Sequence, residues 1–264
     1  MAYAGQLFSN REQLYDVISE QMRDQDFATV PVGELFDSHY LEEAVRHLTP
    51  LVSELSEMPG KEQFHTLLYN NVNGSSIGYE EADRTDPKVY IYFRPELEAY
   101  WKQIGLLDQS QHAVKFIEAA ARVYEGCMQL RQHVVDAFSL KFPGLYKGFQ
   151  GGADVLKFMV YPPHGPCGQH ADPSPVTFHL LERPPGFYVV RDGEHKYASP
   201  NADEALILLG ATFPGLIQSY ESQDKAFLTP TLHGADSDTN GRIAVAFFNR
   251  DGETFGRIPE EDSR

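Results

Sequence analysis

Cysteine is scarce in this chain, and long apolar runs are missing from it. Its 264 residues include two cysteines, Cys127 and Cys167, which are too few for a disulfide framework and form no C-x-x-C motif. We therefore expect both to be thiols in a reducing compartment. No apolar stretch approaches the length of a membrane span, and the charged segment 1–26 lacks the apolar centre of a secretion signal. The sequence predicts a cytoplasmic protein that does not enter the membrane.

Basic residues are also few. Lysine and arginine together number 22 against 38 aspartates and glutamates, which gives a net charge of -16. So acidic a balance argues against nucleic-acid binding, which needs basic groups to neutralise phosphates, and against anionic membrane surfaces. It fits a small-molecule substrate, with a faint preference for a cationic or zwitterionic one. The composition does not choose between a monomer and a dimer.

The composition is that of a globular protein with a sizeable core, at 42% apolar and 12% aromatic residues. We expect one domain over 1–264. Within it, 1–150 would be a mainly helical part with short strands, 151–252 a sheet-rich core that holds the site, and 253–264 a polar tail.

The first part carries helical patterns. Residues 11–25 are typical of a helix, and Asp37 can cap a second helix with apolar residues at helical spacing. The strongest pattern predicts a long helix over 108–138, capped by Asp108 or Ser110, against which a sheet would pack. Residues 27–32 predict a short strand, and 70–92 predict loops and short strands.

After residue 152 the pattern changes to short β-rich runs separated by Pro, Gly, Asp and Asn. The predicted strands are 155–161, 176–181, 186–190, 205–209, 216–219 and 243–248. Closely spaced short strands predict a sandwich or barrel. We expect an α+β fold in which a double-stranded β-helix, the cupin-like jelly roll, is buttressed by the N-terminal helices.

One set of residues points to metal chemistry. His170 and Asp172 form an H-x-D pair, and His233 follows much later, before Arg242. Two imidazoles and a carboxylate can occupy one face of an ion and leave the other face open, which suits Fe(II). Because residues i and i+2 of a strand point the same way, His170 and Asp172 can share one ion at a strand end. His233 must then come from another strand, and Arg242 is far enough along to lie on the next.

Residues 155–250 resemble the C-terminal half of the isopenicillin N synthase-like branch of the non-haem Fe(II)/2-oxoglutarate-dependent oxygenases. The matching segments occur in the family's order: Val160-Tyr-Pro-Pro163, Gly168-Gln-His-Ala-Asp172, Val176-Thr-Phe178, Gly186-Phe-Tyr-Val-Val190, Leu208-Leu-Gly-Ala211, Leu232-His233 and Gly241-Arg-Ile-Ala-Val-Ala-Phe-Phe248.

The resemblance implies an enzyme that uses Fe(II), 2-oxoglutarate and O₂ to oxidise an unactivated C–H bond of a small molecule, releasing succinate and CO₂. It makes His170, Asp172 and His233 the iron ligands. Arg242, whose planar guanidinium binds carboxylates bidentately, and the Tyr161 hydroxyl would bind the cosubstrate. Hydroxylation, desaturation and ring closure stay open as outcomes. Halogenating relatives lack the carboxylate that Asp172 supplies, which argues against halogenation.

Four side chains are expected to line the substrate pocket: Phe178, Phe247, Tyr79 and Arg94.

Two departures from the family's pattern bear on the cosubstrate. Ala244 stands where the family has a serine, and Met159 where it often has an asparagine. Isopenicillin N synthase uses a similar arginine for its substrate and needs no 2-oxoglutarate, so an oxidase of that kind is one alternative. A jelly-roll binding protein without catalytic activity is another.

Overall fold

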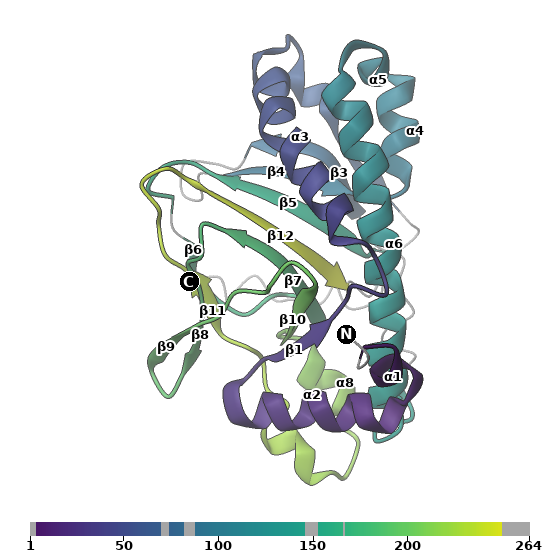
Figure 1. Ribbon diagram of the computed structural model, residues 1–264, viewed down its shortest axis with the longest axis vertical. Helices are drawn as coiled ribbons and strands as arrows, with labels where there is room; N and C mark the ends of the chain where they lie inside the picture. The colour runs from purple at the N-terminus through teal and green to yellow at the C-terminus, as the bar shows by residue number, and fades with distance from the viewer. Residues whose placement is uncertain (1–3, 70–73, 82–87, 146–152, 166, 250–264) are drawn as a thin grey trace.

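The structure is a computed structural model that describes residues 4–69, 74–81, 88–145, 153–165 and 167–249. Two antiparallel sheets face each other, and helices cover the outer side of the larger one (Figure 1). The helices are α1 (Ala4–Ser9), α2 (Arg11–Gln25), α3 (Ser38–Glu57), α4 (Glu96–Gln103), α5 (Leu106–Gln109), α6 (Gln111–Ser139) and α8 (Phe213–Ile217), with 3₁₀ turns η1 (Lys61–Phe64) and η2 (Gln223–Ala226).

In the second half of the chain, the strands pass back and forth between the two sheets. They are β1 (Ala28–Pro31), β2 (His65–Tyr69), β3 (Gly74–Glu81), β4 (Val89–Phe93), β5 (Val155–Tyr161), β6 (Cys167–His170), β7 (Val176–Arg183), β8 (Phe187–Arg191), β9 (Glu194–Tyr197), β10 (Glu204–Leu209), β11 (His233–Ala235) and β12 (Arg242–Asn249). The large sheet has the order β1-β10-β7-β12-β5-β4-β3-β2 and the small sheet β6-β11-β8-β9. This alternation is the expected double-stranded β-helix, extended by strands from the N-terminal half.

One face of the large sheet packs on the helices, above all on α6 (Figure 1). Phe116 of α6 meets Phe158 of β5 edge-on, with ring centroids 4.7 Å apart, and Tyr124 meets Phe247 of β12 at 5.6 Å. Because side chains alternate along a strand, the residues between these apolar ones point to the opposite face. That opposite face looks toward the small sheet and holds the site.

The helix expected over 11–25 is confirmed as α2, and Asp37 caps α3 by accepting a hydrogen bond from the His39 amide at 2.8 Å. The helix expected from residue 108 is divided, however. Asp108 lies in the short α5, and Ser110 is extended and caps α6 by accepting from the Ala113 amide at 3.0 Å.

The strand expected at 216–219 is wrong, because the chain forms α8 there. A proline in the first turn suits a helix start, and Phe213 and Ile217 are buried one helical turn apart. Three short strands, β6, β9 and β11, had no strong apolar pattern to predict them.

Within the residues described, no helix has both the length and the apolar composition needed to cross a membrane. The polar tail expected at 253–264 lies outside these residues.

Candidate active site

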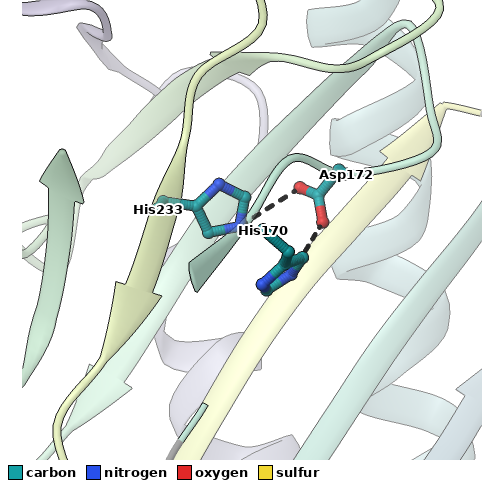
Figure 2. A group of neighbouring side chains, drawn as sticks. All are labelled: His170, Asp172 and His233. Atoms are coloured by element: carbon teal, nitrogen blue, oxygen red, sulfur yellow. Dashed lines mark ion pairs between the residues drawn. The ribbon is translucent and has the colours of Figure 1, made fainter. Parts of the chain in front are cut away.

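Three side chains expected to bind metal meet between the sheets. His170 ends β6, Asp172 follows in the connection to β7, and His233 begins β11 (Figure 2). His233 pairs directly with His170 across the β11–β6 ladder, so strand register brings the two imidazoles together. The Asp172 carboxylate lies 3.5 Å from Nε2 of His170 and 3.7 Å from Nε2 of His233. The ligand atoms of all three lie within 4.8 Å of one another.

A hydrogen bond from Nδ1 to a backbone carbonyl fixes the ring orientation of each histidine. Nδ1 of His170 donates to the Gly168 carbonyl at 2.8 Å, and Nδ1 of His233 donates to the Thr231 carbonyl at 3.0 Å. Both Nε2 atoms are therefore left to face Asp172, as in histidine metal sites where a second hydrogen bond selects the tautomer. One Asp172 oxygen, Oδ2, is buried without a hydrogen-bond partner among the residues described. A cation between these atoms would satisfy it.

The three groups also shift one another's protonation. Its hydrogen bond with Asp172 raises the pKa of His170 to about 10. Burial would raise the pKa of Asp172, but attraction to His233 and the hydrogen bond with His170 outweigh it and hold that pKa below its ordinary value. Burial lowers the pKa of His233. In the absence of metal, the carboxylate is thus ionised and His170 carries the balancing proton.

A cavity of about 250 Å³ opens beside these ligands, between the two sheets. His170, Asp172 and His233 line one side of it, and Arg242 lines another. Its charged lining is mixed, with carboxylates from Asp172 and Glu182 and cationic groups from Lys88, Lys157 and Arg242.

Arg242 begins β12 directly opposite Tyr161, the last residue of β5. Its guanidinium carbon lies 3.8 Å from the centre of the Tyr161 ring, in a cation–π contact. The Tyr161 hydroxyl lies 3.8 Å from the Met159 sulfur. The structure thus brings the two residues together, but Tyr161 supports Arg242 with its ring.

Glu182 is a charged residue of this cavity that the sequence analysis missed. Its Oε1 accepts from Nη1 of Arg242 at 2.6 Å, and its Oε2 lies 3.3 Å from Nε2 of His179. Its side chain is fully buried. A β-bulge brings it there, because Val245 of β12 pairs with Leu181 and the next residue, Ala246, pairs with His179. The extra residue reverses the alternation of β7, so that both His179 and Glu182 face the cavity.

The four side chains expected to line the substrate pocket lie elsewhere. Phe178 and Phe247 stack at 5.7 Å in the core beneath the sheet, because their places in β7 and β12 point toward the helices. Tyr79 donates to Glu81 at 2.6 Å, and buried Arg94 pairs with Glu96 at 3.1 Å. None of the four is among the residues that line the cavity beside His170.

No protein-family model matches the chain, and no curated protein matches it in sequence. Solved structures do match in three dimensions. A 2OG-Fe(II) oxygenase family protein of Caulobacter crescentus is 18% identical with a TM-score of 0.63, over 92% of this chain and 83% of that one. The dioxygenase for auxin oxidation 1 of Arabidopsis thaliana, bound to 2-oxoglutarate, is 14% identical with a TM-score of 0.63, over 92% and 89%.

A Neurospora crassa protein in complex with alpha-KG and 5-formyluracil is 12% identical with a TM-score of 0.62, over 92% of this chain and 79% of that one. At such identities the similarity concerns the fold. The chain has the fold of the 2OG-Fe(II) oxygenases, and its two histidines and aspartate meet inside that fold.

Proposed function

We propose that the protein is an Fe(II)- and 2-oxoglutarate-dependent oxygenase that oxidises an unactivated C–H bond of a small molecule. The observation that carries this proposal is the convergence of His170, Asp172 and His233 beside a cavity that also holds Arg242. For a hydroxylation the reaction balances as R–H, 2-oxoglutarate and O₂ giving R–OH, succinate and CO₂.

The residues present fit the metal. Two Nε2 atoms oriented by carbonyl hydrogen bonds, and an ionised carboxylate with an unpartnered buried oxygen, form a two-histidine, one-carboxylate set. This set favours Fe(II) because it leaves coordination positions open. Bound iron would supply the activation of O₂ and the oxidation of the C–H bond.

The residues present also fit a carboxylate cosubstrate. Arg242 is buried, and its Nε and Nη2 have no hydrogen-bond partner among the residues described. These two N–H groups form one edge of the guanidinium, the edge that binds a carboxylate bidentately. Arg242 would hold the distal carboxylate of 2-oxoglutarate, while the Tyr161 ring keeps the guanidinium in place. The side chains around the cavity orient the ligands and exclude water.

The placement of this protein in the isopenicillin N synthase-like branch is part of the proposal, supported by the ordered segments of 155–250. An oxidase that binds its substrate through Arg242 and needs no keto acid is the competing enzyme, because Ala244 lacks the family's hydroxyl. A small-molecule ligand and no role in nucleic-acid binding are also part of the proposal, supported by the acidic composition. A cytoplasmic location completes it, supported by the two free cysteines.

Anaerobic titration of the Fe(II)-loaded protein with 2-oxoglutarate tests this function. A saturable visible charge-transfer band, lost in Arg242→Ala, is expected from chelation of iron by the keto acid. Candidate substrates are then screened by succinate release. Bound iron without a band would favour the keto-acid-independent oxidase, and a protein that binds no iron would favour the binding protein without activity.

A further inference from the structure

The cavity is lined by the carboxylate of Glu182, which is hydrogen-bonded to the arginine proposed to bind the cosubstrate. Glu182 accepts from Nη1 of Arg242 at 2.6 Å, and both side chains are almost completely buried. Buried charges are stabilised by such pairing, and removing one partner leaves the other uncompensated. The ion pair therefore neutralises much of the charge of Arg242 before any ligand arrives.

Glu182 nevertheless leaves the binding edge of the arginine available. Its contact is with Nη1, whereas Nε and Nη2 are buried without a partner among the residues described. The Tyr161 ring covers one face of the guanidinium. One bidentate edge thus remains for a ligand, and the group that matches its geometry is a carboxylate.

A second carboxylate on the same guanidinium has an electrostatic cost. Like charges at close range repel strongly where water is excluded, and Glu182 and the ligand would share one cation. A polar side chain also lies near the second oxygen of this glutamate: Nε2 of His179 is 3.3 Å from Oε2 of Glu182. His179 stacks on Phe187 with ring centroids 4.4 Å apart, which holds it in position.

We propose that Glu182 competes electrostatically with the ligand for Arg242. It positions the guanidinium through Nη1, and its negative charge weakens the affinity of Arg242 for the distal carboxylate of a dicarboxylic ligand. This role of Glu182 rests on the proposed function, in which the dicarboxylic ligand is 2-oxoglutarate and the dicarboxylic product is succinate. Glu182 is a positioning and specificity-determining residue that acts through Arg242. It sets how strongly the site distinguishes a dicarboxylate from its uncharged diamide, and it favours release of the dicarboxylic product.

Strand pairing explains why this chain accommodates a glutamate here. Ala244 of β12 is the direct neighbour of Glu182 on β7 and of Met159 on β5. Both positions depart from the family's polar pattern; Ala244 lies next to the glutamate, whereas Met159 lies on the other side of β12 from it. With a methyl group at Ala244 there is no hydroxyl beside the carboxylate of Glu182, whose hydrogen bond goes to Arg242 instead.

The test compares a dicarboxylate with its uncharged diamide. Binding of glutarate and of glutaramide to the metal-free protein is measured by titration calorimetry for the unmodified chain and for Glu182→Gln. Glutamine can still accept from Nη1 but carries no charge. We expect glutarate to bind about tenfold more tightly to E182Q while the dissociation constant of glutaramide stays the same. An equal change for both ligands, a weakening for glutarate, or no glutarate binding by either protein would overturn the proposal.

Two further variants control for the fold. Glu182→Asp keeps the charge, so it should not tighten glutarate binding. Glu118→Gln removes an equivalent charge from the exposed surface of α6 and should leave both ligands unaffected. If E182Q is too unstable to assay, Glu182→Ala with the same ligand pair provides the same comparison, because it also removes the charge.

The result is independent of the oxygenase chemistry. Tighter glutarate binding by E182Q, together with no keto-acid band on Fe(II), would uphold the role of Glu182 and reject the proposed function. A keto-acid band together with unchanged glutarate binding would uphold the proposed function and reject the role of Glu182.

Discussion

His233 lies directly opposite His170 across the small sheet, and their ring centroids are 4.5 Å apart. Residues from two distant parts of the sequence thus form one side of the site through strand pairing alone. We expect His233→Ala to weaken Fe(II) binding by about 100-fold or more, because the variant removes one of the three protein ligands of the ion. Iron content after anaerobic loading and desalting measures the loss. His195→Ala, which changes a histidine on β9, should retain the metal.

Metal affinity should rise with pH. The pKa of His170 is raised to about 10 by Asp172, so at neutral pH a metal ion must displace the His170 proton. The apparent dissociation constant for Co(II) should therefore fall by about tenfold per pH unit between pH 6 and 8. Competition with a chelator of known affinity measures this slope. Asp172→Asn removes the group that raises the pKa, and its weaker binding should depend less steeply on pH.

The same shifts predict how stability depends on pH without metal. His170 is raised above the ordinary histidine value, so its contribution is complete below about pH 6.5 and is lost as pH rises toward 10. Asp172 is shifted downward, so its contribution is present above about pH 4 and is lost on acidification. Chemical unfolding of the metal-free protein at several pH values measures both trends. In Asp172→Asn the alkaline decline should shrink; an unchanged decline would assign it to other groups.

Substitutions at Tyr161 test whether its hydroxyl or its ring contributes to carboxylate binding. The resemblance gives its hydroxyl to the ligand, whereas the structure places its ring 3.8 Å from the Arg242 guanidinium carbon. If the ring is what matters, Tyr161→Phe should change the dissociation constant of 2-oxoglutarate by less than about threefold, and Tyr161→Leu should raise it by about tenfold. The visible titration on Fe(II) measures both. A large loss in Tyr161→Phe would restore the hydroxyl as the ligand's donor.

Gly210 controls the position of Asp172. A Cβ atom there would come within 1.6 Å of the Ser174 carbonyl oxygen and 2.8 Å of the Asp172 carbonyl oxygen. Gly210→Ala must therefore displace the backbone that carries Asp172, and we expect it to lower the free energy of unfolding by about 2–4 kcal/mol and to weaken metal binding. Denaturant unfolding measures the first effect. Gly215→Ala is the matched control, because no described atom outside its chain neighbours and its own helix backbone lies within 4 Å of its added Cβ.

Local pattern predicted the elements whose apolar residues are continuous or periodic. The strand expected at 155–161 is β5 with the same bounds, and the helix at 11–25 is α2. Strands β6, β9 and β11 are short and carry polar or glycine residues, so their pairing depends on distant partners. That pairing cannot be read from a local window.

The cavity was less predictable than the metal ligands, for a geometric reason. Phe178 and Phe247 belong to the face of the sheet that packs on helices, which a sequence pattern can suggest only when the two faces differ in polarity. Glu182 would fall on that same face by simple alternation. Only the bulge, a property of the pairing between β7 and β12, turns it toward Arg242.

The difference in charge between the cavity and the whole chain affects the rate at which a ligand enters. The chain carries a net charge of -16, whereas the cavity lining includes Lys88, Lys157 and Arg242. A dicarboxylate is thus repelled at long range and attracted only after it has entered. Its association rate should increase with ionic strength, because salt screens the long-range repulsion while buried groups are screened much less. For this protein, salt should therefore speed the approach of a dicarboxylate while changing its binding inside the cavity much less.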